Sequence, residues 1–286
     1  MRKSAILFPA VLFSTAFGVA GGRSAVPAPL PGYLVHFNSL ENAQEGEDVV
    51  AVAKQAGAKV INVVPPPHVW ERPDAMALLD DLVQYIGASH LKLIFTRMDA
   101  SYPPDREGNR QTYPFSDRGK WAEDETRFYA KRFGSLKYLA GFSLEVSTGQ
   151  YEACRRIWHE ESQRADVPFI LAFDGSQEVS LSTADAIGLS FGPSLIQTNT
   201  GQLKEIHDSG KDVFILEAGC EDLRFCASVA KSLASKTFIY AYLKEPFDLK
   251  DEKNPGWIVD REGNVRRNAY KSTKKVMADF LNKRSP

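Results

Sequence analysis

Two apolar runs in the sequence end on a glutamate. Residues 212–219 read Asp-Val-Phe-Ile-Leu-Glu-Ala-Gly, and residues 139–147 read Leu-Ala-Gly-Phe-Ser-Leu-Glu-Val-Ser. Uninterrupted apolar runs of this length are typical of strands that are buried on both faces. An ionised group at the end of such a strand is costly unless it is solvated or paired, so Glu145 and Glu217 are candidates for chemistry rather than for packing.

Two carboxyl groups that face each other meet the requirement for cleaving a glycosidic bond. One must be protonated beside the leaving oxygen, and the other must be ionised beside the anomeric carbon. If Glu145 and Glu217 close the fourth and seventh strands of a barrel, they face each other across its mouth. In the retaining reaction such groups lie ~5–5.5 Å apart, and their repulsion raises the pKa of the acid.

Strand-like and helix-like segments alternate along the chain. Strands are expected at residues 33–38, 59–64, 91–97, 139–145, 168–174, 186–191, 213–217 and 238–243. Helices are expected at residues 47–56, 74–86, 121–133, 150–164, 200–209, 221–234 and 268–282, with a short or irregular connection at 177–185. The charged residues at 123–131 indicate a solvated helix face.

The alternation predicts parallel strands joined by right-handed crossovers. A chain of 286 residues suits one (β/α)₈ barrel, which needs roughly 250. No glycine-rich loop follows the first strand, which is against an open dinucleotide-binding sheet. We therefore predict an α/β fold, a single (β/α)₈ TIM barrel. Residues 100–119, rich in Pro, Gly, Asp and Arg, are expected to overhang its mouth.

Side chains near the carboxyl ends of the strands combine aromatic rings with hydrogen-bonding groups. A sugar-binding cleft needs both, because rings contact the apolar faces of sugars and polar groups bind hydroxyls. The candidate substrate-binding residues are His36, Asn38, His68, Trp70, Arg97, Asp174, Tyr240, Tyr242 and Lys244.

Structural interpretations of the same residues remain open. Glu217 can instead pair with Lys244 or Arg97 as a structural carboxylate. The two histidines can be hydrogen-bonded loop residues, and the three aromatic residues can be packing. Either Asp174 or Asp99 can serve an inverting arrangement, in which the carboxyl groups are ~6.5–9.5 Å apart.

At these segments the sequence resembles the clan of retaining glycoside hydrolases that have (β/α)₈ barrels. The resemblance is carried by residues 137–145, 184–193, 214–219 and the turn at 256–270. It implies that Glu145 is the acid/base on strand four and Glu217 the nucleophile on strand seven. Leu144 stands where the clan usually has an asparagine before the acid/base. Phe191 and Gly192 stand where a tyrosine commonly orients the nucleophile, and Tyr242 stands near the place of a tryptophan.

Composition excludes several other classes of partner. The formal net charge of −1 gives no electrostatic attraction to nucleic acid or to an anionic membrane. No His or Cys spacing matches a zinc signature, so we expect no metal and no cofactor. Of the three cysteines, Cys220 and Cys226 are spaced so that a disulfide bond can form in an oxidising compartment.

The first 25 residues have the pattern of a signal peptide. Arg2 and Lys3 precede an apolar stretch at 5–20, and small residues follow at 21–25. The alternative is a retained N-terminal anchor. We expect residues 26–286 to form a secreted or periplasmic catalytic barrel that does not contact the membrane after cleavage. The predicted function is hydrolysis of a poly- or oligosaccharide. The alternatives are a carbohydrate-binding pseudoenzyme and, from another class, a barrel phosphodiesterase or lyase.

Overall fold

Eight parallel strands form a closed barrel in which β8 pairs with β1. The computed structural model describes residues 28–66, 69–97, 118–144, 148–173, 181–191, 200–218, 223–244, 257–260 and 262–282. The strands are β1 (Leu30–His36), β2 (Val60–Val64), β3 (Lys92–Arg97), β4 (Leu139–Leu144), β5 (Phe169–Phe173), β6 (Ala186–Phe191), β7 (Asp212–Ala218) and β8 (Thr237–Tyr242). The prediction of a (β/α)₈ TIM barrel is confirmed.

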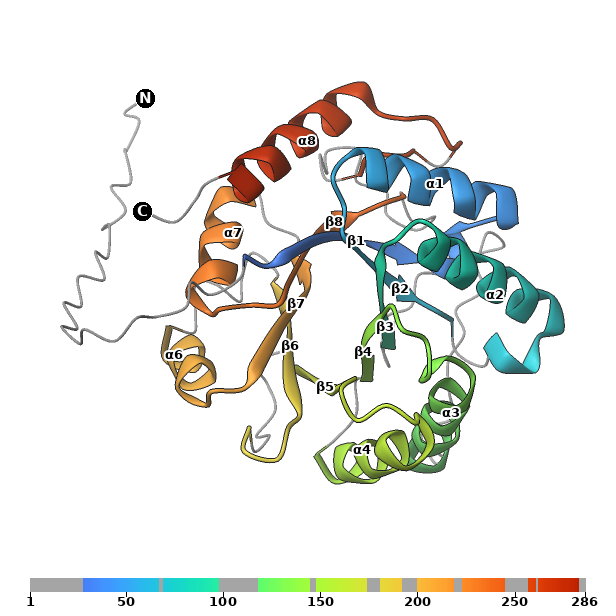
Figure 1. Cartoon of the computed structure of the whole chain (residues 1–286), viewed down its shortest axis with the longest axis vertical. Helices are drawn as coiled ribbons and strands as arrows, with labels where there is room; N and C mark the ends of the chain where they lie inside the picture. The colour runs from blue at the N-terminus through green and yellow to red at the C-terminus, as the bar shows by residue number, and fades with distance from the viewer. Residues whose placement is uncertain are drawn as a thin grey trace, which may run out of the picture.

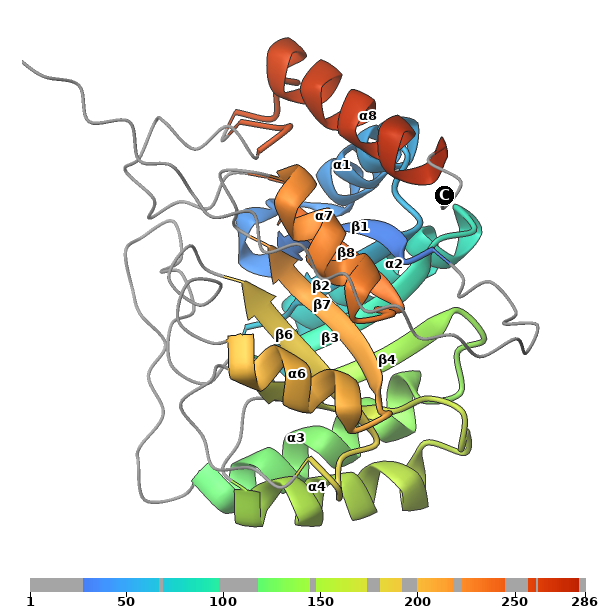
Figure 2. The ribbon, with the colours of Figure 1, turned by 90° about the vertical axis from the view of Figure 1, so that its left-hand side faces the viewer.

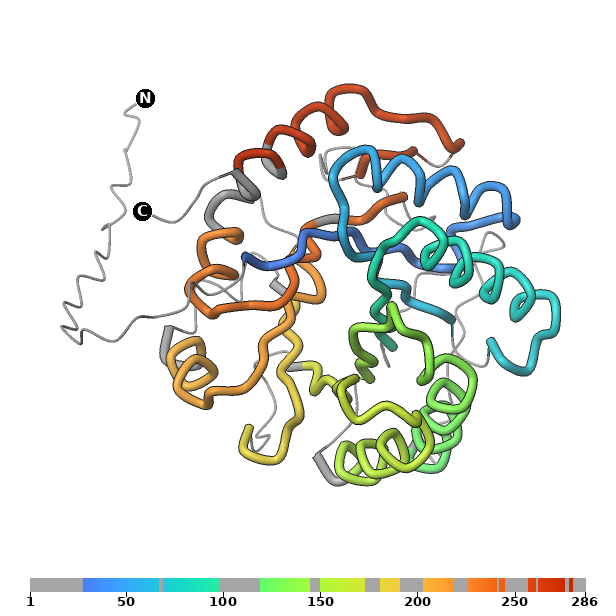
Figure 3. The backbone as a smooth tube through the Cα atoms, viewed as in Figure 1, coloured from blue at the N-terminus to red at the C-terminus, as the bar shows by residue number. Residues whose placement is uncertain are grey.

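Helices surround the ring of strands (Figure 1). They are α1 (Ala43–Gln55), α2 (Pro73–Ala88), α3 (Arg118–Phe133), α4 (Thr148–Glu161), α6 (Thr200–Asp208), α7 (Leu223–Ser232) and α8 (Arg267–Asn282). The chain passes around the ring in sequence order, so that its first and last strands become neighbours (Figure 3). None of the helices in the described ranges is both long and apolar enough to span a membrane.

The strand side chains divide into two cores. Along β1, Tyr33 and Val35 belong to an outer core between strands and helices, whereas Leu34 belongs to an inner core that fills the barrel. Successive side chains of a strand point to opposite faces, which explains the division. The inner core consists of Leu34, Val60, Val64, Ile94, Ile170, Ala186, Phe214, Leu216 and Ile239. The side view shows the layer of helices outside the strands (Figure 2).

Local signals determine where the first two helices begin. Helix α1 begins at Ala43 rather than at residue 47, because the side chain of Asn42 accepts a hydrogen bond from the backbone N–H of Glu45 at 3.0 Å. Helix α2 begins at Pro73, whose missing N–H has no partner to lose in the first turn. The apolar stripe predicted for this helix is buried, namely Met76, Leu79, Leu82, Val83 and Ile86.

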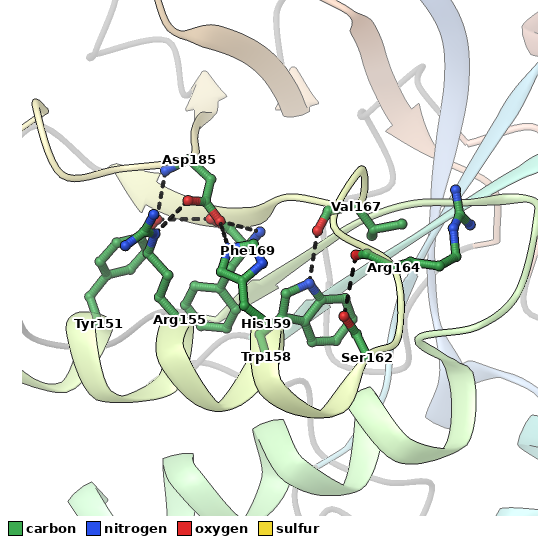
Figure 4. A network of polar contacts seen from close by, with 9 residues as sticks. All are labelled: Tyr151, Arg155, Trp158, His159, Ser162, Arg164, Val167, Phe169 and Asp185. Carbon is green, nitrogen blue, oxygen red and sulfur yellow. Dashed lines mark hydrogen bonds and ion pairs between the residues drawn. The ribbon is translucent and has the colours of Figure 1, made fainter.

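Helix α4 is fixed to the strands by a buried indole and a polar cluster (Figure 4). The ring of Trp158 stacks on Phe142 of β4, with centroids 4.9 Å apart and 8° between the planes. Its Nε1 donates to the carbonyl of Val167 at 2.9 Å. Asp185, directly before β6, pairs with Nε2 of His159 at 2.6 Å. These contacts join one helix to β4 and to the segments that lead into β5 and β6.

Several connections differ from the expectation or are described only in part. The first strand ends at His36 rather than at residue 38, and the 3₁₀ helix η1 (Phe37–Ser39) follows it. Of the connection at 177–185 only residues 181–185 are described, and they form turns. Most of residues 100–119 lie outside the described residues.

Residues 257–260 and 262–266 form a short turn before the last helix. Val259 bridges both to Lys244 and to Val265. The carboxylate of Asp260 accepts a hydrogen bond from the backbone N–H of Asn264 at 2.7 Å, and the side chain of Trp257 is fully buried. This segment therefore packs onto the barrel where β8 ends.

Candidate active site

Glu217 and Tyr242 meet at the inner mouth of the barrel. Glu217 lies near the carboxyl end of β7, and Tyr242 is the last residue of β8. The hydroxyl of Tyr242 donates a hydrogen bond to Oε1 of Glu217, with 2.6 Å between the two oxygens. Both residues are partly exposed. Active sites of (β/α)₈ barrels lie at this edge, which makes Glu217 a candidate for chemistry.

His36 of β1 lies against the ring of Tyr242. Its ring stacks on Tyr242, with centroids 5.2 Å apart and 27° between the planes. Burial lowers the pKa of His36 to about 3, so the imidazole is neutral at ordinary pH. Only 4% of the residue is exposed. His36 is thus better placed to support the ring of Tyr242 than to reach a sugar.

Two shifts in strand register turn Glu217 and Tyr242 inward. Phe214 and Leu216 of β7 belong to the inner core, so strict alternation would send Glu217 to the helix side and Ala218 inward. Leu189 of β6 pairs with Ile215, but Ser190 pairs with Glu217, which leaves Leu216 as an extra residue. Ala218 accordingly lies in the outer core. Such bulges commonly re-aim a side chain beside an active site.

The end of β8 shows the same reversal. Ile239 lies in the inner core and Tyr240 in the outer core. Between Gly32 and Leu34 of β1 the partner strand advances by three residues, from Ile239 to Tyr242. Tyr242 therefore packs against the inner core instead of facing the helices.

The electrostatic state of Glu217 reflects two opposed effects. Burial is the larger and raises the pKa of the carboxyl group above its usual range. The hydrogen bond from Tyr242 lowers that pKa, because it stabilises the ionised form. The tyrosine thus orients the carboxylate and also favours its charge.

Glu217 does not form the ion pair with Lys244 or Arg97 that its structural interpretation predicts. Both cations are buried elsewhere and are paired with other carboxylates. Lys244 is fully buried beneath η1, where its Nζ donates to the carbonyl of Ser39 at 2.8 Å and pairs with Glu45 of α1. Lys244 therefore connects the end of β8 to the first helix, and the prediction that it binds substrate is corrected.

Arg97 also has a structural place rather than a sugar-binding one. It follows Thr96 at the end of β3 and has no exposed surface. Its Nε pairs with Oε1 of Glu125 at 2.7 Å, and its guanidinium lies 5.0 Å from the ring centre of Trp121. Both partners are on α3. The interpretation of residues 123–131 as a solvated face is wrong at Glu125, which has no exposed surface.

Tyr240 is likewise corrected from a sugar platform to a core residue. It is 1% exposed and its ring centre lies 4.7 Å from that of Tyr33, on the outer side of the barrel.

Asn38 and Trp70 lie on the connections after β1 and β2. Asn38 lines a pocket of about 650 Å³ beside the start of α2, and the Trp70 ring packs edge-on against Phe128 at 5.4 Å.

Four of the predicted residues cannot be placed. Glu145, His68, Asp174 and Cys220 lie outside the described residues. Leu144, which precedes Glu145, is fully buried in the outer core, so it presents no polar group to the mouth. Within the described ranges, no three His, Cys, Asp or Glu side chains are grouped as metal ligands.

Sequence reasoning missed two polar residues inside the barrel. Asn62 of β2 and Thr96 of β3 are buried, and the Thr96 hydroxyl donates to Oδ1 of Asn62 at 2.9 Å. The signal was an asparagine in the middle of the apolar run Val-Ile-Asn-Val-Val. A buried polar side chain in an apolar strand needs hydrogen-bond partners, so this asparagine predicts a polar contact inside the fold.

No protein-family model matches the sequence, and no curated protein matches it. Solved structures do match. A GH5_18 protein from Streptomyces cattleya, solved with GlcNAc, is similar with a TM-score of 0.63 at 11% identity, over 91% of this chain and 82% of that one. An endo-beta-1,4-mannanase from Thermotoga petrophila gives 0.62 at 10% identity, over 90% and 78%. The catalytic domain of the major endoglucanase from Xanthomonas campestris pv. campestris gives 0.59 at 11%, over 88% and 94%. At these identities the likeness shows the fold.

The Glu125→Gln variant is expected to lower the free energy of unfolding by about 3–5 kcal/mol, because it removes the buried negative charge that pairs with Nε of Arg97. Urea unfolding measures the change. The exposed pair of Asp124 and Arg127 on the same helix provides the control, since Asp124→Asn should cost less than about 1 kcal/mol. Equal stability of Glu125→Gln and the unmodified protein would contradict the structural role of Arg97.

The raised pKa of Glu217 predicts how stability changes with pH. A group whose pKa is higher in the folded state gives its full stabilisation below the unfolded-state pKa and loses it as pH rises through the folded-state pKa. Glu217→Gln keeps the neutral form, so it should match the unmodified protein in acid and exceed its Tm near neutral pH. Thermal unfolding from about pH 3 to about pH 8 tests this. Glu205→Gln on the exposed side of α6 is the control, and a lower neutral Tm for Glu217→Gln would refute the prediction.

Proposed function

We propose that the protein is a glycoside hydrolase that cleaves a poly- or oligosaccharide with retention, with Glu217 as nucleophile and Glu145 as acid/base. The observation that carries the proposal is the hydrogen bond from Tyr242 to Glu217 at the inner mouth of the barrel. A tyrosine that orients the nucleophile is expected of such an enzyme, and here it comes from β8 instead of the β6 end. Similarity to solved structures of an endoglucanase and a mannanase supports the class.

The geometry of Glu217 suits attack on an anomeric carbon. Oε1 accepts the hydrogen bond from Tyr242, which leaves Oε2 for the sugar. In the first step Oε2 bonds to the anomeric carbon while the acid gives its proton to the leaving oxygen. In the second step water, deprotonated by the same residue, displaces Glu217 and releases the sugar.

Glu145 is assigned to the acid/base role from its place in the sequence. It directly follows β4, and Glu217 is the second-last residue of β7; the carboxyl ends of parallel strands meet at one edge of a barrel. Two carboxyl groups at this edge supply the proton donor and the nucleophile. The candidate substrate-binding residues His68 and Asp174 belong to the same edge by sequence.

A carbohydrate-binding pseudoenzyme is the second candidate, and Leu144 favours it. The side chain is fully buried in the outer core, so it cannot contribute the sugar hydroxyl contact that the clan's asparagine makes. A binding protein on the same barrel would keep the cleft and lose turnover.

An activity screen against polysaccharides and aryl glycosides tests the proposal. The unmodified protein should release sugar with retained anomeric configuration, which NMR of the first product reveals. Glu217→Gln should lower kcat by about 10⁴-fold or more. Glu145→Gln should lower it by about 10²–10⁴-fold on polysaccharides, and by less on aryl glycosides whose leaving group needs little protonation.

Glu205→Gln is the matched control, because this glutamate is exposed on helix α6 rather than at the end of a strand. An inverted product would overturn the assignment of Glu217 as nucleophile. Binding of a glycan by all variants with turnover by none would favour the pseudoenzyme.

A second part of the proposal concerns export. The signal-peptide pattern of residues 1–25 supports a secreted or periplasmic protein, and this compartment would allow a bond between Cys220 and Cys226. Cys226 is buried in α7, and Cys154 is buried and free.

Thiol titration of the denatured protein checks the disulfide. We expect one reactive thiol before reduction, from Cys154, and all three cysteines after it. Cys154→Ala should then show no thiol before reduction, and three thiols in the unreduced exported protein would contradict the bond.

A further inference from the structure

The carbonyl of Leu216 is held from across the barrel. Leu216 is the extra residue of the β7 bulge and has no partner in the register with β6. The Nδ2 of Asn62 donates to this carbonyl at 2.9 Å. Because β2 pairs with β1 and β3, this hydrogen bond passes through the barrel interior rather than along the sheet.

Asn62 is itself fixed in one orientation. It has no exposed surface and lies between Ile61 and Val63, both of the outer core, so its side chain points inward. A carbonyl only accepts, so the Nδ2 of Asn62 must face Leu216 and its Oδ1 must face Thr96. The hydroxyl of Thr96 donates to that Oδ1 at 2.9 Å. Three consecutive hydrogen-bonding groups thus end on the bulge.

The bulge decides where Glu217 points. Regular alternation after Leu216 would turn Glu217 toward the helices, away from Tyr242. A bulged residue leaves a backbone group unpaired, and a buried unpaired carbonyl is costly. The amide of Asn62 satisfies that carbonyl and so stabilises the bulged form over the regular one.

We propose that Asn62, oriented by Thr96, is a positioning residue that holds the β7 bulge and thereby aims Glu217 at the mouth of the barrel. The inference rests on the proposed function for its kinetic part, since it explains how the nucleophile is placed. Its structural part is independent of activity, because the bulge and the contact between Tyr242 and Glu217 can be observed directly.

Matched variants separate positioning from packing. Asn62→Leu removes both hydrogen bonds and keeps the number of side-chain heavy atoms and the branch at Cγ, and Thr96→Val removes only the donor to Asn62. Thr96→Ser keeps that donor and should retain activity. Ser143→Ala is the control, because Ser143 is buried between the outer-core residues Phe142 and Leu144, and its hydroxyl has no hydrogen-bond partner in the described part of the chain.

A displaced nucleophile should change kcat more than KM. We expect Asn62→Leu to lower kcat by about 10- to 100-fold with a much smaller change in KM, since a misplacement of about 1 Å can cost about 10²-fold. Thr96→Val should show a smaller loss of the same kind. Both variants should shift the acid limb of the plot of kcat/KM against pH to higher pH. The reason is that they weaken the hydrogen bond that lowers the pKa of Glu217.

A double variant tests whether Asn62 acts through the same contact as Tyr242. If it does, Asn62→Leu added to Tyr242→Phe should cost little more than the worse single change. Independent multiplication of the two effects, or a Thr96→Val enzyme with unchanged kcat and acid limb, would overturn the proposal.

Crystal structures of Asn62→Leu and Thr96→Val decide the matter without turnover. Loss of the β7 bulge, or separation of Tyr242 from Glu217 beyond hydrogen-bond reach, is the expected result for Asn62→Leu. Retention of the bulge with the 2.6 Å contact would refute the positioning role even if the unmodified protein hydrolyses glycans. If the unmodified protein hydrolyses no glycan, the proposed function is refuted. The two variant structures would still test whether Asn62 holds the β7 bulge.

Discussion

The alternation of side chains along a strand is the constraint on which this barrel and its candidate site depend. In regular stretches it sends one residue to the inner core and the next to the outer core, as at Tyr33 and Leu34. At the ends of β7 and β8 a shift of register reverses the order, and Glu217 and Tyr242 turn inward together. A carboxylate and its hydrogen-bond donor are thus brought together by two local departures from regularity, each in an otherwise ordinary strand.

The same constraint separates what the sequence could predict from what it could not. The barrel was predictable because eight apolar runs and the helical stripes between them all specify one architecture, and Glu217 was recognisable as a carboxylate that ends such a run. The face on which a strand-end residue lies was not predictable, since a single added residue reverses it. Tyr240 was therefore assigned to the mouth although it lies in the outer core. Arg97 was misassigned because its partner, Glu125, belongs to a helix whose many charged residues predict an exposed surface.

The distribution of charge inside the protein has a chemical logic. Among the described residues, Arg97 and Lys244 are buried cations near strand ends, and each pairs with a glutamate of a helix, Glu125 and Glu45 respectively. Glu217 receives a neutral hydroxyl donor instead. A hydrogen bond of this kind orients a carboxylate without the strong attraction of a salt bridge. A positively charged partner would make the carboxylate a weaker nucleophile. Neutral His36 beneath the tyrosine ring adds no charge to this arrangement.

The contacts that complete the mouth join the first strand to the last. His36 belongs to β1 and Tyr242 to β8, and Glu45 and Lys244 are separated by 199 positions in the sequence. During synthesis the N-terminal part of the barrel is made long before β8 leaves the ribosome, and contacts between distant parts of a chain form late. No nascent chain that lacks β8 can hold Tyr242 against Glu217. The candidate site is therefore absent from every translation product that stops before β8, and it arises only with the closed ring.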